Sequence, residues 1–204
     1  AEARRLGSDV HKRDLVGRTD FRSQVTVTID GEHARDFDDA ITIEKHPNGN
    51  FWLGVHIADV ANYVPEGGAL DEEAYERATS VYFPDRAVHM FPADLSTGLC
   101  SLNPHVDRLV QSCLMEVDRK GSVLRYEIHD GVIHSDARMT YTDVNAILTD
   151  HDETTSARRG CEAGRRAPHS ILRGRAHAGT PNGPGRLDGI GRDPAGSDHH
   201  RLSI

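Results

Sequence analysis

An α+β fold, with a mixed and largely antiparallel sheet and a few helices, is the fold class that this 204-residue sequence predicts. Apolar and polar residues alternate over 25–29, which is β-branched throughout, a pattern typical of a half-buried strand, and further short apolar segments follow along the chain. Short loops of turn-forming residues join neighbouring segments, which favours hairpins. Helix-like stretches are few and do not alternate regularly with the strands, so a sheet built from adjacent hairpins is expected.

Each predicted element has its own local signal. Turn formers from His46 to Asn50 separate two strands, and acidic residues in the first turn of a helix suit its dipole. The last helix has Thr140 or Thr142 as its cap. In order, the sequence predicts a short helix within residues 1–20, strands at 25–29, 40–44 and 51–57, a helix at 70–79, an extended stretch at 80–91, strands at 109–118 and 124–133, and a helix at 142–148.

The composition changes abruptly near residue 153. Residues 154–204 carry nine Arg, four acids and no Phe, Trp or Tyr, whereas residues 1–153 have a net charge of −13. So few large apolar groups cannot offset the ordering entropy of a chain, roughly 1–2 kcal/mol per residue. The sequence therefore predicts an N-terminal linker at 1–20, a folded domain at 21–153, and an Arg-, Gly- and Pro-rich tail at 154–204. This tail is disordered, an Arg/Gly RNA-binding segment, or a frame-shifted translation.

Several protein classes are excluded by simple features. No run of about 18 apolar residues is present, so no transmembrane helix is predicted. The charged start of the chain is not followed by the apolar stretch of a secretory signal. Cys100, Cys113 and Cys161 are odd in number and lack C-x-x-C spacing, which indicates free thiols and a cytoplasmic location. The chain opens without Met, so we expect a piece of a longer protein.

Four aspartates within ten residues form the most informative motif. Asp30, Asp36, Asp38 and Asp39 lie between two predicted strands. One Asp at a strand end is usually a turn or cap residue, but four such charges repel one another unless some are exposed, protonated or neutralised by cations. Asp36 and Asp38 are two residues apart, so in extended chain they project to the same side, whereas Asp39 projects to the other. An all-oxygen set suits hard cations such as Mg²⁺ or Mn²⁺.

A calcium-binding EF-hand is the main alternative for this motif. A loop that starts at Asp36 requires Gly at its sixth position and Glu at its twelfth, but these positions hold Ile41 and Pro47. A two-metal phosphodiesterase centre fits the pattern better. In such a centre, paired ions orient an attacking water and neutralise the leaving oxygen.

The string TIDGEHARDFDDA, followed by the blocks HIADV, TSVYFP and LCSLN, resembles the catalytic domain of RNB-type exoribonucleases, the ribonuclease II/ribonuclease R family. The similarity runs from about residue 14 to residue 150 and is strongest to the bacterial ribonuclease R branch. It implies a cytoplasmic, monomeric enzyme that uses Mg²⁺, with Mn²⁺ as the alternative ion. This enzyme would degrade single-stranded RNA from its 3′ end to nucleoside 5′-monophosphates, with no action on DNA.

The resemblance also implies roles for individual residues. Asp30, Asp36, Asp38 and Asp39 would be the metal-binding aspartates, and Asp38 the one on which the chemical step most depends. Tyr82 matches the aromatic residue that stacks on the terminal base, although without the family a core tyrosine beside Phe83 would be favoured. His33 stands where relatives commonly have Asp, and little effect is expected.

The resemblance covers only the N-terminal part of the catalytic domain. It implies that a later helical half, with a second stacking aromatic and a catalytic arginine, has no counterpart in residues 154–204, so this chain alone is expected to be inactive. A non-catalytic RNA- or metal-binding module derived from the same domain is the alternative function.

Overall fold

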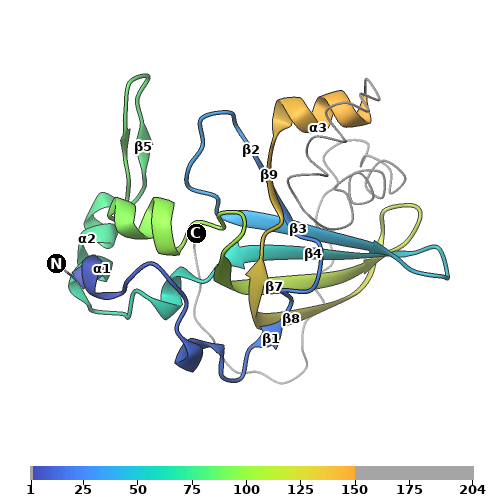
Figure 1. Ribbon diagram of the computed structural model, residues 1–204, viewed down its shortest axis with the longest axis horizontal. Helices are drawn as coiled ribbons and strands as arrows, with labels where there is room; N and C mark the ends of the chain where they lie inside the picture. Colours follow the sequence, from blue (N-terminus) through green and yellow to red (C-terminus); the bar gives the residue numbers. More distant parts are fainter. Residues whose placement is uncertain (1, 150–204) are drawn as a thin grey trace, which may run out of the picture.

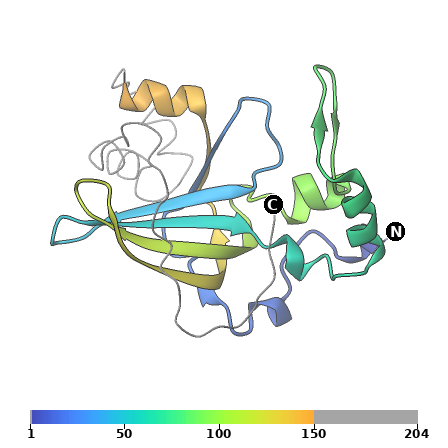
Figure 2. The same ribbon diagram turned by 180° about the vertical axis from the view of Figure 1, so that it is seen from behind.

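The structure, a computed structural model, describes residues 2–149, so the predicted tail at 154–204 lies outside the described residues. Seven strands form one sheet in the order β1-β8-β7-β4-β3-β2-β9 (Figure 1). A group of short helices lies at one end of the sheet in both views (Figure 2). The sheet is mixed and largely antiparallel, which confirms the predicted α+β class.

Two long hairpins make the centre of the sheet. The predicted strand segments form β3 (Asp39–Lys45) with β4 (Phe51–Ala58), and β7 (Asp107–Val117) with β8 (Val123–His134). In the first hairpin the His46 amide donates to the Asn50 carbonyl at 2.9 Å. Gly49 has a φ of +86° there, a conformation that a residue with a Cβ rarely adopts. The predicted turn of residues 46–50 therefore closes the β3–β4 hairpin.

The edges of the sheet use parallel pairing between distant segments. β2 (Val27–Asp30) is antiparallel to β3 and parallel to β9 (Ala137–Thr140). β1 (Thr19–Asp20) is parallel to the end of β8. Neither β1 nor β9 was predicted, because both are short and depend on partners more than 100 residues away for their hydrogen bonds. The predicted strand at 25–29 begins two residues later, at Val27, and includes Asp30.

The last helix, α3 (Tyr141–Leu148), begins at a capping box. The Asp143 amide donates to the Thr140 hydroxyl at 3.1 Å, and the Asp143 carboxylate accepts from the Thr140 amide at 3.2 Å. This reciprocal arrangement satisfies donors that a helix start otherwise leaves unpaired. The fully buried side chains of Val27 and Met139, together with Ile147, join α3 to β2 and β9. Of the two caps that the sequence allowed, the structure uses Thr140.

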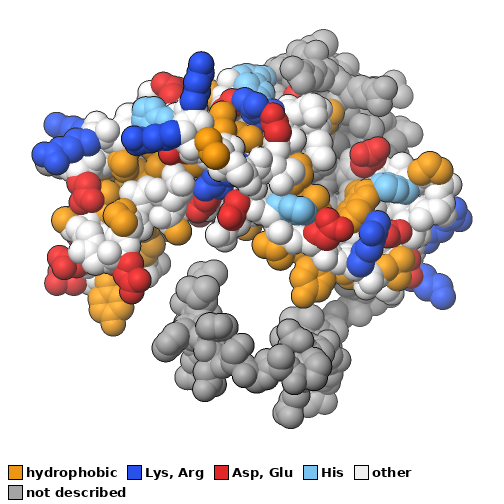
Figure 3. Space-filling view, turned by 90° about the horizontal axis from the view of Figure 1, so that it is seen from below, with side chains coloured by type: hydrophobic (Ala, Val, Ile, Leu, Met, Phe, Trp, Pro, Cys, Tyr) orange, Lys and Arg blue, Asp and Glu red, His pale blue; other side chains and the backbone are white. Residues whose placement is uncertain are grey.

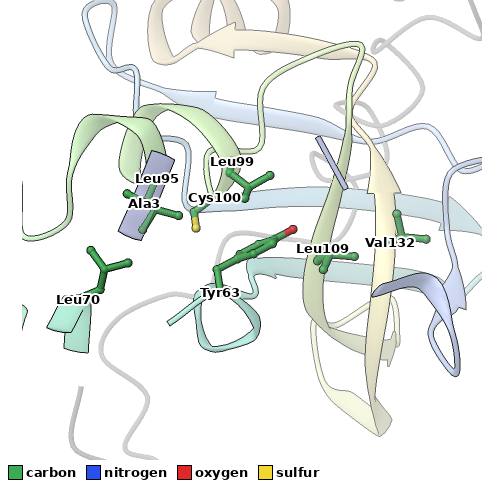
Figure 4. Close-up of a cluster of buried hydrophobic side chains, with 8 residues drawn as sticks. All are labelled: Ala3, Tyr63, Leu70, Leu95, Leu99, Cys100, Leu109 and Val132. Carbon is green, nitrogen blue, oxygen red and sulfur yellow. The ribbon is translucent and has the colours of Figure 1, made fainter. Parts of the chain in front are cut away.

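The helical end packs on β7 and β8 through one apolar cluster (Figure 4). Its elements are α1 (Glu2–Arg5), the 3₁₀ turns η1 (Lys12–Leu15) and η2 (Val60–Asn62), α2 (Ala69–Arg77), and a π-helical turn, η3 (Asp94–Leu99). Leu95 and Leu99 are almost fully buried between Ala3 of α1 and Leu109 of β7. Part of the predicted linker at 1–20 therefore contributes to the core.

The predicted extended stretch at 80–91 is a small separate hairpin of β5 (Val81–Tyr82) and β6 (Ala87–Val88). It stands out from the helical end on the same side as the loop between β2 and β3 (Figure 1). On the face shown in Figure 3, acidic, basic and apolar side chains are interspersed. Among the described residues, no helix is long and apolar enough to cross a membrane.

Candidate active site

The four aspartates flank or lie within the loop of residues 31–38, which joins β2 to β3. Asp30 is the last residue of β2, and Asp39 is the first residue of β3. β2 is held between β3 and β9, and the Asp30 backbone is in register with Thr140. Both ends of the loop therefore start from paired strands inside the sheet.

The middle of the loop is anchored by a buried serine from the LCSLN block. The Phe37 amide donates to the Ser101 hydroxyl at 3.0 Å, and that hydroxyl donates to the Arg35 carbonyl at 3.0 Å. The Leu102 amide donates to the Phe37 carbonyl at 2.8 Å. Phe37 is 4% exposed, so its ring fixes the backbone between Asp36 and Asp38. Because these contacts span more than 60 residues, no local signal in the sequence indicated the role of Ser101.

Three of the aspartates meet at one open pocket of about 570 Å³. Asp30, Asp36 and Asp38 line it together with Tyr82 from β5. Asp39 is exposed and is not among the lining residues, as the two-residue alternation of an extended chain predicts. The remaining lining residues come from the same loop, from β6 and its end, and from η3: Gly31, Glu32, His33, Ala34, Arg35, Ala87, His89 and Thr97.

The carboxylates act on one another electrostatically. Partial desolvation in the pocket raises the pKa of Asp38, and the charges of Asp36, Asp39 and Asp30 raise it further. Asp38 still has a solvent-accessible surface, so it lies in a hollow and not in the core. The folded chain therefore holds a negative charge at Asp38 against the repulsion of its three neighbours. A bound cation would relieve this repulsion.

Tyr82 reaches the aspartates directly. Its hydroxyl donates to Oδ2 of Asp36, and this hydrogen bond is the main cause that raises the pKa of Tyr82 to about 12. His89 lies beside both groups, with its Nδ1 3.8 Å from the same Asp36 oxygen and its ring edge-on to the Tyr82 ring at 6.3 Å. The tyrosine side chain is nevertheless 65% exposed, so a ring face is accessible to a stacking partner.

The donor set fits a hard divalent ion by its chemistry. The pocket offers carboxylate oxygens, the ligands that Mg²⁺ and Mn²⁺ prefer. The charges of neighbouring aspartates raise the pKa of Asp38, and a bound cation would offset that repulsion. Within residues 2–149, no group of three or more His, Cys, Asp or Glu side chains is drawn together as tightly as metal ligands are. Tyr82 holds one oxygen of Asp36.

His56 of β4 and Asp59, which follows that strand, have structural partners and lie outside the pocket lining. His56 is fully buried in the sheet, where its Nδ1 is 2.8 Å from the Ser112 hydroxyl. Asp59 pairs with Arg18 at 2.6 Å and caps η2 by accepting from the Asn62 amide. His89 is a pocket residue that the sequence analysis did not single out, and its place in an extended apolar stretch offered no signal.

Comparison with known protein families matches residues 18–174 to the RNB domain, which is more than half of the chain. The chain belongs to the RNB domain family. The match begins one residue before β1 and extends past residue 153, where the composition changes. The pocket described above therefore lies inside the RNB domain.

Curated proteins that are similar to this chain include ribonucleases R of several bacteria. This chain is 56% identical over 149 residues to ribonuclease R of Thermotoga maritima. The aligned segment covers 73% of this chain and 21% of that protein. The chain is 52% identical over 148 residues to ribonuclease R 2 of Lactococcus lactis, with 72% and 22% covered. The chain thus spans about a fifth of the length of these curated relatives.

A solved structure with the same arrangement is RNase R of Mycoplasma genitalium in complex with ribose methylated single-stranded RNA. It superposes with a TM-score of 0.68 at 35% sequence identity, and the similarity covers 75% of this chain and 24% of that one. The RNB fold described above is therefore that of known ribonuclease R proteins.

Proposed function

We propose that this RNB domain supplies the metal-binding carboxylates and one base-stacking tyrosine of a 3′-to-5′ exoribonuclease. The enzyme would hydrolyse single-stranded RNA to nucleoside 5′-monophosphates. One observation carries the proposal: Asp30, Asp36 and Asp38 line one open pocket with an exposed tyrosine. Ribonuclease R relatives at 56% and 52% identity, and an RNA complex of a relative with the same fold, support RNA as the substrate.

Asp30, Asp36, Asp38 and Asp39 would hold Mg²⁺, with Mn²⁺ as the alternative ion. When bound, such ions lower the pKa of an attacking water and neutralise the charge that develops on the leaving oxygen. A bound cation would stabilise the charged form of Asp38 in particular, because desolvation and all three acidic neighbours raise the pKa of this residue. We therefore assign Asp38 as the residue on which turnover depends most.

Tyr82 would hold the 3′-terminal nucleotide. Its ring is exposed at the mouth of the pocket, and base-aromatic stacking contributes roughly 1–3 kcal/mol to binding. Its hydroxyl is fixed by Asp36, so the ring stands in a set orientation beside the carboxylates. A base that stacks on it would bring the terminal phosphodiester to the acidic side of the pocket.

The isolated chain is expected to bind RNA weakly and to cleave it slowly or not at all. Four acids line the pocket, against Arg35 and two histidines, and residues 1–153 carry a net charge of −13. Phosphate contacts with Lys and Arg supply most of the affinity for nucleic acid, and this surface supplies few. In a longer protein of this kind, tight RNA binding would come from segments that match the rest of the relatives' length, which this chain does not span.

The test is decay of a 5′-labelled oligoribonucleotide by Thermotoga maritima ribonuclease R whose matching segment is replaced by residues 18–149 of this chain. We expect Mg²⁺-dependent stepwise shortening, which Asp38→Asn removes while RNA binding is retained. Asp130→Asn is the matched control, because Asp130 is exposed on β8 and lies outside the pocket lining. The 204-residue chain is assayed in parallel.

Two outcomes would contradict the proposal. Equal decay by the chimera and its Asp38→Asn variant would remove the aspartate pocket from catalysis. If the chimera with all four aspartates binds RNA but does not shorten it, the result would support the alternative, a non-catalytic RNA- or metal-binding module. Robust Mg²⁺-dependent trimming by the 204-residue chain alone would refute the expectation that it is inactive by itself.

A further inference from the structure

Arg138 is a residue of β9 that contacts the start of the aspartate loop, whereas Ser101 contacts its later half. β9 runs parallel to β2, with Arg138 in register with Thr28. From there the guanidinium Nη2 donates to the Gly31 carbonyl at 2.9 Å and to the Glu32 carbonyl at 2.6 Å. These are the first two residues after Asp30, so Arg138 fixes the point at which the loop leaves the strand.

The same guanidinium also reaches the other end of the loop. Its Cζ lies 5.3 Å from the centroid of the Phe37 ring, within the range of a cation–π contact. Phe37 is 4% exposed and stands between Asp36 and Asp38. One side chain therefore touches both the backbone that follows Asp30 and the ring that separates the next two aspartates.

The loop has few other internal restraints. Two hydrogen bonds of the described backbone lie within this segment: the Ala34 amide donates to the Gly31 carbonyl at 3.2 Å, and the Gly31 amide donates to Oδ1 of Asp30 at 2.7 Å. Ser101 and Leu102 hold the half that contains Arg35 and Phe37. On the Gly31–Glu32 half, the hydrogen bonds to the rest of the described fold are those that Arg138 donates to the two carbonyls.

We infer that Arg138 is a positioning residue, which sets the spacing between Asp30 and the Asp36–Asp38 pair and so the metal affinity of the pocket. This inference rests on the proposed function, because it takes the aspartates as ligands. Arg suits the role since its Nη2 donates to the two carbonyls while the guanidinium lies over a ring. A lysine ammonium could donate to carbonyls but has no planar group to pack on the ring. Partners that orient metal ligands typically change metal affinity by 10- to 100-fold when they are removed.

The test uses the 204-residue chain and two measurements. The first is the Kd for Mn²⁺, from the electron paramagnetic resonance signal of the free ion. The second is amide hydrogen exchange of residues 31–38 without metal. Wild type is compared with Arg138→Gln, which removes the charge, and with Arg138→Lys, which keeps it. Arg125→Gln is the matched control, because Arg125 also lies over a ring, that of Trp52 at 4.9 Å, and pairs with Glu116, but on a remote part of the sheet.

We expect Arg138→Gln to raise the Mn²⁺ Kd about tenfold or more. Arg138→Lys should give a smaller rise, and Arg125→Gln should leave the Kd unchanged. In both Arg138 variants, faster exchange should be confined to residues 31–38. If Arg138→Gln does not fold, Arg138→Lys is judged by the same two measurements.

An unchanged Kd in a folded Arg138 variant would overturn the inference, as would faster exchange spread evenly over β2, β3 and β9, which marks a merely structural role. Asp38→Asn separates this failure from that of the proposed function. If wild type and Asp38→Asn bind Mn²⁺ equally, or neither binds, the metal-binding part of the proposed function fails. The exchange of residues 31–38 in the metal-free chain then still decides whether Arg138 holds the loop.

Discussion

His56 should make the stability of this domain depend on pH between pH 7 and pH 4. Its imidazole is fully buried between β3 and β7, with Nδ1 2.8 Å from the Ser112 hydroxyl and Nε2 3.3 Å from the Thr42 hydroxyl. Burial lowers its pKa from 6.5 to about 4, because the charged ring would lose its hydration. The folded state therefore keeps His56 neutral over a pH range in which the unfolded chain protonates it.

The sign follows from proton uptake. Below pH 6.5 the unfolded chain binds a proton that the folded chain rejects, so the free energy of unfolding falls as the pH falls, and the loss is complete near pH 4. A difference of about 2.5 pKa units corresponds to about 3 kcal/mol in total. Between pH 7 and pH 5, the expected loss is about 2 kcal/mol. Well above pH 7 His56 contributes no pH dependence.

Urea unfolding at pH 7, 6 and 5 measures this effect, followed by far-UV circular dichroism and by fluorescence of Trp52, the single tryptophan of the chain. His56→Gln removes the titrating group, so its loss of stability between pH 7 and pH 5 should be smaller than that of wild type by about 2 kcal/mol. His11→Gln, an exposed histidine, serves as the control and should behave as wild type. Equal slopes for wild type and His56→Gln would refute the argument that a buried neutral imidazole controls this pH dependence.

Two further predictions concern single side chains. Thr140→Ala should lower the free energy of unfolding by about 1 kcal/mol, because it removes the α3 cap, whereas Thr142→Ala should change it little; equal losses in urea unfolding would assign no special role to the capping box. Tyr82→Ala in the ribonuclease R chimera should weaken RNA binding by roughly 1–3 kcal/mol and change the length of the final product. Tyr82→Phe keeps the ring and loses only the hydrogen bond to Asp36, so a product length equal to that of Tyr82→Ala would contradict stacking as its role.

The sequence predicted the central hairpins well because their signals are local. Short apolar segments at 40–44 and 51–57, with turn formers between them, are enough to place β3 and β4 and the loop that joins them. The Thr140 cap and the helix after it are also local features. β1 and β9 were missed, since two to four residues carry no period and their pairing is decided by strands more than 100 residues away.

In the candidate site, too, local features were predictable from the sequence and long-range contacts were not. Spacing alone placed Asp36 and Asp38 on one side and Asp39 on the other, and the pocket has this arrangement. The contacts of Ser101 and Arg138 with the loop bridge long stretches of chain, so only the folded structure reveals them. The hydrogen bond from Tyr82 to Asp36 likewise depends on how the β5–β6 hairpin stands beside the loop.

Metal-dependent stability tests the central claim, that the aspartate pocket binds a divalent cation, most directly. The free energy of unfolding of the 204-residue chain is measured with and without Mn²⁺ at a hundredfold excess over its Kd. Binding to the folded state alone predicts a rise of about 2.7 kcal/mol. The variant with both Asp30→Asn and Asp38→Asn should show no such metal-dependent rise. The same rise in that double variant, or no rise in wild type, would contradict the assignment of these aspartates as metal ligands.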